Sequence, residues 1–343
     1  MTEVPGLRIR DERLEVSRTY LGEPVVVPVR VVEAGKPGPV LLITAAIHGD
    51  EINGTGILHD LMVDDPPALV RGRLVMVPVA NVFGFEAQDR YMPDRRDLNR
   101  CFPGDPHGSL ARRVAHVIFH ELVLRCDYAV DLHTAATGRT NFPTARGDLR
   151  DPEVRRLARA FGCELIINSR GPAGALRRAA TEAGRPTILF EAGETSKVEG
   201  AVVRVGSRGL RNVLVELGMT EGRPRRPAYQ TRVDQTRWVR AVQGGILRFH
   251  VSLGDPVSKG EPIATNVDVL GNAQHVVRSP FDGVVLGMTT LPAVKPGEPI
   301  CNLAKPRKSL ERIREILADA PTRSLGSRVR KDLATSVDVR RAT

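Results

Sequence analysis

The chain has 343 residues, of which 41% are hydrophobic and 26% are charged. This length accommodates two domains of about 150 residues each, and the apolar content is sufficient for a folded core. No stretch approaches the roughly 20 apolar residues of a membrane-spanning helix, and the chain does not begin with a basic and then an apolar segment, so we expect neither a membrane protein nor a signal peptide. The four cysteines are widely spaced and form no CxxC pair, which predicts a protein of the reducing cytoplasm without a disulfide framework.

The net charge of +10 at first suggests an acidic partner such as nucleic acid. Residues 305–343 contain eleven Lys or Arg and five Asp or Glu, so this tail contributes +6 and the rest of the chain only +4. The chain has a single tryptophan, which argues against a platform that stacks on bases. We therefore expect a solvated basic tail and no nucleic-acid partner.

The first two thirds of the chain alternate between strand-like and helix-like segments. In chain order, the sequence predicts strands over 25–32 and 40–47, a helix over 53–62, a strand over 74–79, a helix over 110–124, a strand over 128–132, a helix over 152–161, a strand over 165–168, a helix over 173–183, a strand over 187–190 and a helix over 198–217. Such alternation is typical of an α/β fold, in which helices flank both faces of a mostly parallel or mixed sheet. Sites in such sheets form beyond the carboxyl ends of the strands.

A different pattern begins after 222–228, a Pro-rich and basic segment that we interpret as a linker. Residues 239–303 contain short β-branched runs separated by Gly, Pro and Asp turns, which predicts a small all-β module. An amphipathic helix over 310–317 and a mobile polar tail follow. The predicted domains are an α/β domain with the candidate site over 1–222, a β module over 223–304, and a helix with a basic tail over 305–343.

Two histidines and a glutamate lie at the ends of predicted core strands. His48 and Glu51 follow one strand around a tight turn, and His133 ends another. This residue set holds the catalytic zinc ion of carboxypeptidase A, with one position open for water. Alone, His-x-x-Glu would indicate a core histidine and a glutamate that favours the helix dipole, but with His133 the set predicts one bound Zn²⁺ per chain. Asp131, on the same strand face as His133, either orients a ligand or caps a loop.

Glu191 follows three apolar residues at the end of a third predicted strand. A charge in that position is costly unless it has a task. A carboxylate beside a metal-bound water can take its proton and later pass it to a leaving amine, so Glu191 is the candidate general base. Glu194 is the competitor, and we prefer Glu191 because it lies closer to the strand end.

The segment 90–104 is a predicted loop with four arginines and paired turn residues. A guanidinium can hold a carboxylate through two parallel hydrogen bonds. Asn99 beside Arg100 could therefore bind a substrate carboxylate, and another arginine could stabilise an oxyanion. The local sequence alone slightly favours a solvated basic loop.

Four motifs in this order resemble those of the succinylglutamate desuccinylase/aspartoacylase family, whose members are zinc carboxypeptidase-like amidohydrolases. The motifs are His48-Gly49-Asp50-Glu51, Asp97-Leu98-Asn99-Arg100-Cys101-Phe102-Pro103-Gly104, Asp131-Leu132-His133 and Glu191-Ala192-Gly193. The resemblance implies a zinc carboxypeptidase-like catalytic domain with a specific set of roles. These are zinc ligands at His48, Glu51 and His133, a general base and acid at Glu191, a substrate carboxylate site at Asn99 and Arg100, and an oxyanion site at Arg90, with Arg95 and Arg96 as rivals for Arg90.

The resemblance further implies a homo-oligomer that acts on small N-acylated amino acids. It implies another substrate-binding arginine before Glu191, for which Arg177 and Arg178 are the candidates. Glu194 departs from the family pattern because a small or neutral residue is expected there, so an added acidic group would face the substrate. The basic tail after Lys305 is a second departure.

The β module resembles a biotinyl/lipoyl-like barrel in the stretches 254–261 and 279–283. A carrier of that type needs an exposed lysine at a hairpin tip, and the corresponding stretch 266–271 has none. We therefore expect no covalently attached cofactor, and we expect the module to shape or cover the active site.

Together these features predict a zinc-dependent hydrolase that removes the acyl group from an N-acylated amino acid or a related small molecule. A metallocarboxypeptidase that acts on short peptides is the alternative, because it would use the same machinery with a different pocket. A non-catalytic binding protein is a third hypothesis, against which the complete set of candidate ligands and a candidate base argue.

Overall fold

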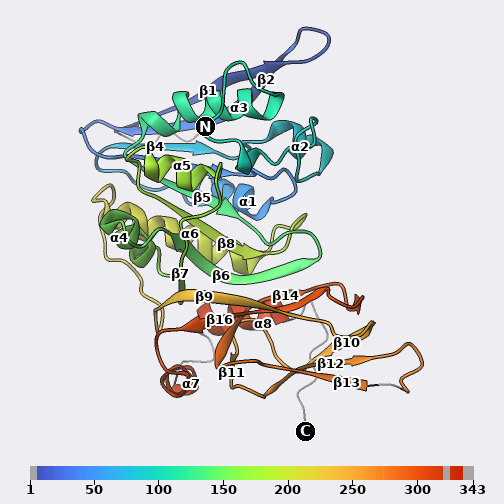
Figure 1. Cartoon of the computed structure of the whole chain (residues 1–343). Coiled ribbons are helices and arrows are strands. Elements are labelled where there is room, and N and C mark those ends of the chain that lie inside the picture. The colour runs from blue at the N-terminus through green and yellow to red at the C-terminus, as the bar shows by residue number, and fades with distance from the viewer. Residues whose placement is uncertain (1–5, 273, 320–324, 335–343) are drawn as a thin grey trace.

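The computed structural model describes residues 6–272, 274–319 and 325–334, and its main feature is one long mixed sheet of twelve strands (Figure 1). The strand order is β1 (Leu7–Arg18), β2 (Pro24–Ala34), β4 (Arg73–Val77), β3 (Val40–Ala45), β5 (Tyr128–His133), β8 (Thr187–Gly193), β6 (Arg139–Gly147), β7 (Leu165–Asn168), β9 (Thr231–Arg240), β16 (Pro299–Pro306), β14 (Gly283–Thr289) and β11 (Pro256–Val257). The four neighbours β4, β3, β5 and β8 run parallel. The carboxyl ends of β3, β5 and β8 therefore lie at the same edge of the sheet.

Helices cover both faces of this sheet. The side chains of β3 are buried on both faces, so each face needs such a cover. Leu41 and Ile43 belong to one buried cluster and Leu42 to the other, because successive side chains of a strand point to opposite faces. The first cluster includes residues of α1 (Asn53–His59), α4 (Pro152–Phe161) and α6 (Gly200–Glu216), and the second includes residues of α3 (Leu110–Glu121) and α5 (Leu176–Glu182). A short helix, α2 (Val82–Ala87), precedes the arginine-rich loop. The predicted mixed α/β fold is confirmed.

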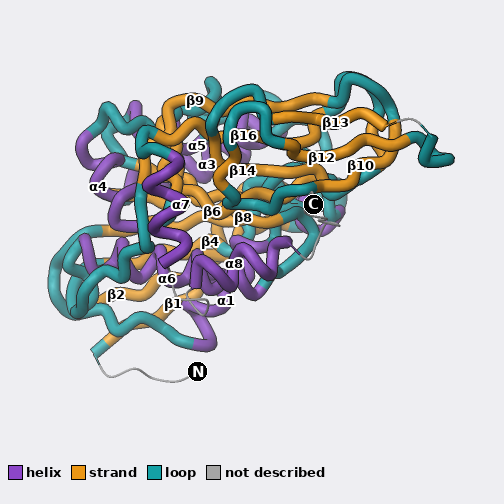
Figure 2. The backbone as a smooth tube through the Cα atoms, turned by 90° about the horizontal axis from the view of Figure 1, so that it is seen from below, coloured by secondary structure: helices purple, strands orange, loops and turns teal. Residues whose placement is uncertain are grey.

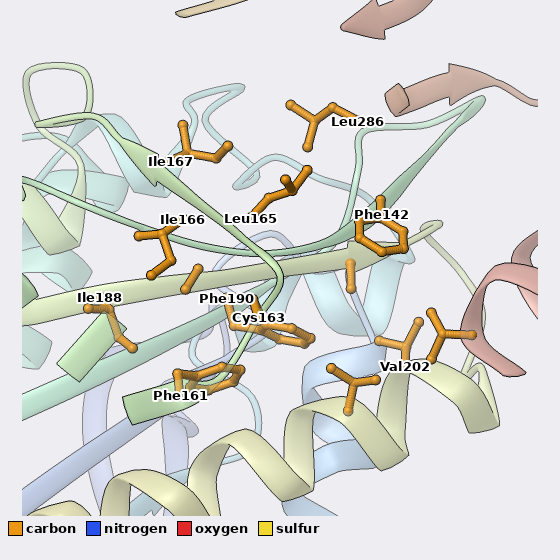
Figure 3. Close-up of a cluster of buried hydrophobic side chains, with 14 of the residues drawn as sticks. Phe142, Phe161, Cys163, Leu165, Ile166, Ile167, Ile188, Phe190, Val202 and Leu286 are labelled. Carbon is orange, nitrogen blue, oxygen red and sulfur yellow. The ribbon is translucent and has the colours of Figure 1, made fainter. Parts of the chain in front are cut away.

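The first core cluster is anchored by two aromatic rings between α6 and the sheet (Figure 3). The ring centroids of Phe161 and Phe190 are 4.9 Å apart, and both side chains are buried. Gly209 of α6 permits this packing, because a Cβ atom there would lie 2.2 Å from the Phe161 ring. Leu286, from the C-terminal part of the chain, belongs to the same buried cluster as Phe142. The core is thus continuous between the N-terminal and C-terminal parts.

The C-terminal part both extends the main sheet and folds back on it. Its second sheet has four strands, β13 (Gln274–Arg278), β12 (Pro262–Val267), β10 (Gly245–Phe249) and β15 (Ala293–Val294). In the main sheet, β14 pairs with β6 as well as with β16, which closes β6, β7, β9, β16 and β14 into a five-stranded ring. This ring lies below the parallel strands in Figure 1 and is seen from below in Figure 2. The expected short β strands are present, while the division at residues 222 and 304 stays a prediction.

Two helices follow the last strand. α7 (Leu310–Asp319) matches the helix expected over 310–317. α8 (Leu325–Ala334) falls in the tail that was expected to be mobile, and it packs against α6, where Arg204 forms an ion pair with Asp332 at 3.0 Å. Arg330 of α8 also pairs with Glu164, which is 8% exposed. The expectation of a mobile tail is therefore wrong for 325–334, because the folded body offers a buried acidic partner, Glu164, and a basic partner, Arg204. The expected mobility of 335–343 concerns positions outside the described residues.

No helix in the described part of the chain is long and apolar enough to cross a membrane. Two strands were not predicted, β1 and β6. The second of these carries several residues of the site described next.

Candidate active site

Three side chains converge at the carboxyl ends of β3 and β5. His48 and Glu51 lie between β3 and α1, and His133 is the last residue of β5. His48 Nδ1 is 2.6 Å from Glu51 Oε1, and His133 Nδ1 is 2.8 Å from Glu51 Oε2. All three side chains are buried, and one ligand atom from each lies within 4.8 Å of the others. The three residues predicted to bind metal are therefore in one place and could hold one ion.

Each histidine is fixed by a second carboxylate on its other ring nitrogen. His48 Nε2 lies 3.1 Å from Asp97 Oδ1, and His133 Nε2 lies 2.8 Å from Asp131 Oδ2. A carboxylate at Nε2 orients the ring and leaves Nδ1 for a metal ion. Asp131 is buried and also accepts a hydrogen bond from Thr44 Oγ1 at 2.7 Å. Of the two roles weighed for Asp131, the contact with His133 favours orientation of a ligand.

The charges of this cluster are strongly coupled. Burial alone would raise the pKa of Glu51, but the charges and hydrogen bonds of His48 and His133 hold it well below its usual range. Burial would lower the pKa of His133, yet Asp131 and Glu51 raise it to about 10. An ionised carboxylate and two imidazole nitrogens directed at one point form a donor set that suits a zinc ion, which would replace the imidazole protons there.

The backbone before the cluster is tightly constrained. Ala46, two residues before His48, has a φ of +48°, a left-handed conformation that is uncommon for a residue with a side chain. A Cβ atom on Gly49 would lie 1.9 Å from the carbonyl carbon of Gly84. Only glycine permits this close approach, so the loop that carries His48 and Glu51 is fixed against the segment that leads to the arginine-rich loop.

Glu191 lies opposite His133 in the parallel pairing of β5 and β8. Its Oε1 accepts a hydrogen bond of 2.5 Å from Asn141 Nδ2, and its Oε2 is 3.1 Å from Arg146 Nη1. The Glu194 carboxylate instead contacts Lys197 Nζ at 2.5 Å and Thr290 Oγ1 at 2.6 Å. Of the two candidates, Glu191 lines the cavity described below, and the expectation that Glu194 faces the substrate is not met because its oxygens are bound elsewhere.

The arginine-rich loop places Arg90 against the metal cluster. Arg90 Nη1 donates to Glu51 Oε1 at 3.0 Å, and its Nη2 donates to Asp97 Oδ2 at 3.1 Å. The rivals lie elsewhere: Arg95 is exposed, and Arg96 lies 3.8 Å from Asp94 on the surface. Arg90 is therefore the arginine of this loop that borders the cluster.

Asn99 and Arg100 occupy a 3₁₀ turn that follows Asp97. Asn99 is buried, and its Oδ1 accepts a hydrogen bond from the backbone N–H of Leu176 at 2.9 Å, so its Nδ2 group is the part available to a substrate. Arg100 Nη1 donates to the Asn99 carbonyl at 2.7 Å. Both residues line the cavity.

The cavity beside the cluster has a volume of about 280 Å³. Besides the predicted residues, it is lined by polar, aromatic and charged side chains that the sequence alone did not assign to the site. These include Arg139, Asn141, Arg146, Arg177, Trp238 and Asn302.

Arg177 was one of two candidates for a further substrate-binding arginine. Its side chain is buried and donates to Ser169 Oγ at 3.3 Å, while the neighbouring Arg178 pairs with Glu182. Burial and the nearby Arg146 lower the pKa of Arg177 to about 10, so the guanidinium remains charged at neutral pH. Arg177 is therefore the candidate that reaches the cavity.

Comparisons with known proteins show which family and which relatives the chain resembles. The model of the succinylglutamate desuccinylase/aspartoacylase catalytic domain matches residues 37–217. The chain is 33% identical over 300 residues to the N-alpha-acetyl-L-2,4-diaminobutyric acid deacetylase of Halomonas elongata, covering 83% of this chain and 87% of that protein.

Solved structures are similar over nearly the whole chain. The product-bound ectoine utilization protein EutE (DoeB) from Ruegeria pomeroyi matches with a TM-score of 0.76 and 26% identity, covering 87% of this chain and 95% of that one. A succinylglutamate desuccinylase/aspartoacylase from Rhodobacter sphaeroides matches with a TM-score of 0.76 and 28% identity, covering 88% and 96%.

Proposed function

The chain belongs to the succinylglutamate desuccinylase/aspartoacylase family, and from this premise we propose that it is a zinc-dependent deacylase that hydrolyses the amide bond of an N-acylated amino acid or a related small molecule. One observation carries the proposal: both oxygens of Glu51 meet Nδ1 of His48 and of His133, beside a cavity that also contains Glu191. A relative is named for the removal of an acetyl group from an amino acid, which supports the same reaction class here.

His48, Glu51 and His133 would hold one zinc ion per chain. Bound there, zinc would polarise the scissile carbonyl and lower the pKa of a water molecule. Asp97 and Asp131 hold the two imidazoles in the orientation that this binding needs.

Glu191 is the proposed general base and acid. Asn141 and Arg146 fix its carboxylate from two sides, so it is positioned to take a proton from the attacking water and to deliver it to the leaving amine. Arg90, at the edge of the cluster, is positioned to donate hydrogen bonds to the oxyanion.

The substrate carboxylate is proposed to bind at Asn99 and Arg100, with Arg177 as a further donor. Two guanidinium groups and an amide on one side of a cavity match the geometry of a carboxylate. This places the amino-acid part of the substrate on that side.

Three further proposals rest on the family resemblance and the sequence. We propose the domain division 1–222, 223–304 and 305–343, with a lipoyl-like β module that lacks a carrier lysine in 266–271. We also propose a homo-oligomer and a cytoplasmic location, which the four free cysteines support.

Metal analysis combined with hydrolysis tests the proposed function. The purified protein is analysed for bound metal and assayed with N-acetyl and N-succinyl amino acids before and after chelation. About one zinc per chain and chelator-sensitive release of an amino acid are expected. Absence of bound metal after zinc is added back would contradict the assigned ligands, and cleavage of dipeptides but not of N-acyl amino acids would favour the carboxypeptidase.

A further inference from the structure

A second hollow region of the molecule lies along α4, apart from the candidate active site (Figure 1). It consists of two adjoining hollows of about 470 Å³ and about 290 Å³, both of which Arg155 and Arg159 line. Of the described residues that line these hollows, none borders the cavity beside His48. We call this region the basic groove, because its described lining contains six arginines and a single acidic residue: Arg155, Arg156, Arg159, Arg226, Arg232, Arg307 and Glu216.

Three of the groove arginines have no acidic partner among the described residues. Arg155 Nη1 donates to the carbonyl of Leu149 at 3.5 Å, and neither Arg159 nor Arg226 makes a described side-chain hydrogen bond or ion pair. Arg155 and Arg159 are four residues apart, so their like charges face each other on the surface of α4 and repel. Positive charge without a partner therefore gathers where the two hollows meet.

The other three arginines are paired but do not cancel this charge. Arg156 contacts Glu153 at 2.6 Å and Glu216 at 3.3 Å. Asp234 bridges Arg232 and Arg307, with 2.6 Å to each. Six guanidinium groups and three carboxylates leave the basic groove with a net charge of +3.

The floor of the groove is held in place by hydrogen bonds. Leu149 is buried, and its N–H donates to Asn168 Oδ1 at 3.0 Å, while Asn168 Nδ2 donates to Asp234 Oδ1 at 2.8 Å. Gln230 Nε2 donates to the carbonyl of Arg159 at 3.2 Å. These bonds connect β9 with α4 and with the loop before it, so the arginines are positioned before a ligand arrives. The buried apolar floor also strengthens the attraction between a guanidinium and an anion.

The spread of the charges suits a chain of anionic groups better than a single one. Arg155 and Arg159 are separated by one helical turn, about 6 Å along the axis of α4. Arg226 borders only the smaller hollow and Arg307 only the larger one. Guanidinium groups bind phosphate oxygens through paired hydrogen bonds, and a chain of phosphates can contact several of these arginines at once.

The lining also indicates what the ligand lacks. The described residues of the two hollows include no aromatic side chain. A nucleic acid base therefore has no ring on which to stack, which is the contact that single-stranded nucleic acid commonly uses. The groove offers partners for phosphates and none for a base.

We propose that the basic groove is a binding site for a short chain of phosphate groups. Inorganic triphosphate and a nucleoside triphosphate share this chemistry, and recognition through the phosphates alone gives them similar affinities. The inference does not depend on the proposed deacylase function, because the groove and the cavity share no described residue.

Binding is measured by calorimetry on the full-length protein at physiological ionic strength without added magnesium. The probes are inorganic triphosphate, ATP and inorganic phosphate. Triphosphate is expected to bind at least about 10-fold more tightly than phosphate, and ATP within about 3-fold of triphosphate. Arg155→Gln combined with Arg159→Gln should weaken triphosphate by about 10-fold or more.

Arg112→Gln combined with Arg113→Gln is the matched control. Both arginines are exposed on α3, which packs on the other face of the sheet, so this pair removes the same charge elsewhere. It should leave the triphosphate affinity unchanged. Arg177→Gln alters the cavity alone and should also leave it unchanged.

Arg226→Gln provides a second groove variant outside any helix or strand, in case the α4 pair does not fold in a thermal unfolding assay. It should weaken triphosphate by about 2- to 5-fold. Absence of triphosphate binding, an unchanged affinity in the folded groove variants, or equal losses in the α3 pair would each overturn the inference. A loss in Arg177→Gln would place the triphosphate in the cavity, and tighter binding of ATP by more than about 10-fold, or of a short oligouridine, would indicate a nucleotide or RNA site instead.

Discussion

The two walls of the cavity differ in how their polar groups are used. On the wall built by β3, β5 and β8, Glu51 contacts two histidines, Arg90 and the backbone N–H of Thr134. On the wall built by the ring, Asn141 and Arg146 bind Glu191, but Arg139 lies on an aromatic face and the buried Oδ1 of Asn302 has no described hydrogen-bond partner. Polar groups that already bind each other fix a reaction geometry, whereas groups without partners remain available to a ligand. We infer that the first wall, with Asn141 and Arg146, sets the geometry of the reaction and that the rest of the ring wall contributes to the choice of substrate.

The largest expected effect on kcat is that of Glu191→Gln. The amide cannot take a proton from water, so kcat should fall by roughly 10² to 10⁴-fold while the bound metal is retained. Steady-state kinetics with metal analysis on the same sample measures both. Glu194→Gln is the matched control and should have a much smaller effect on kcat, since its carboxylate contacts Lys197 and Thr290. Equal losses in the two variants would contradict the assignment of the base.

Asp131→Asn removes the carboxylate that orients His133 and leaves the three proposed zinc ligands in place. Without the carboxylate on His133 Nε2, zinc affinity should fall by roughly 10 to 100-fold. Competition with a chromophoric chelator measures the affinity. Asp64→Asn, at an exposed position, should leave it unchanged. An unaltered zinc affinity in Asp131→Asn would mean that Asp131 serves only the packing against Thr44.

Gly287→Ala tests whether the two walls are coupled. Gly287 of β14 pairs with Asn141 of β6, and a Cβ atom there would lie 2.3 Å from Asn141 Oδ1. Displacement of Asn141 would break its hydrogen bond to Glu191. As a result, kcat should fall by roughly 10-fold with unchanged metal content. Gly35→Ala is the control, because no atom lies within 4 Å of its Cβ position. A kcat equal to that of the parent would show that the walls act independently.

Trp238→Leu should have the smallest effect. Loss of the aromatic face under Arg139, which lines the cavity, should raise the KM for an N-acyl amino acid by about 2- to 5-fold in steady-state kinetics. Trp238→Phe retains an aromatic face and should fall between the parent and the leucine variant. An unchanged KM in Trp238→Leu would mean that the aromatic face does not contribute to substrate binding.

The first wall could be predicted from the sequence, because its residues follow apolar strands. The buried runs that form β3, β5 and β8 are short and apolar, so a histidine or a glutamate directly after one of them is conspicuous. The helix over 152–161 was predicted with its observed bounds, since Asp151 accepts hydrogen bonds at its N-terminus and Pro152 occupies its first turn.

The second wall could not be predicted in the same way, because β6 does not resemble a strand in sequence. Pro143 interrupts it, and the pairing with β8 shifts register between Asn141 and Thr144 at that point. Arg139, Asn141 and Arg146 line the cavity and Thr140 and Thr144 are also buried, so the usual alternation of apolar and polar positions is missing. Asn141 and Arg146 were overlooked for this reason.

β1 was missed for a different physical reason. It lies at the edge of the main sheet with β2 as its neighbour, and of its twelve residues Val16 is buried. An edge strand that is largely exposed tolerates charges at most positions, so its composition carries little of the apolar signal of a strand.

The pairing of β6 with β14 also has a consequence for how the protein folds. Arg139 meets Thr289 roughly 150 positions later in the chain, and closing so long a loop is entropically costly and slow. During synthesis, His48, Glu51 and His133 emerge from the ribosome well before the strand that completes the cavity. A nascent chain therefore possesses its proposed metal ligands before it possesses its ring wall, and that wall is the last part of the cavity to be completed.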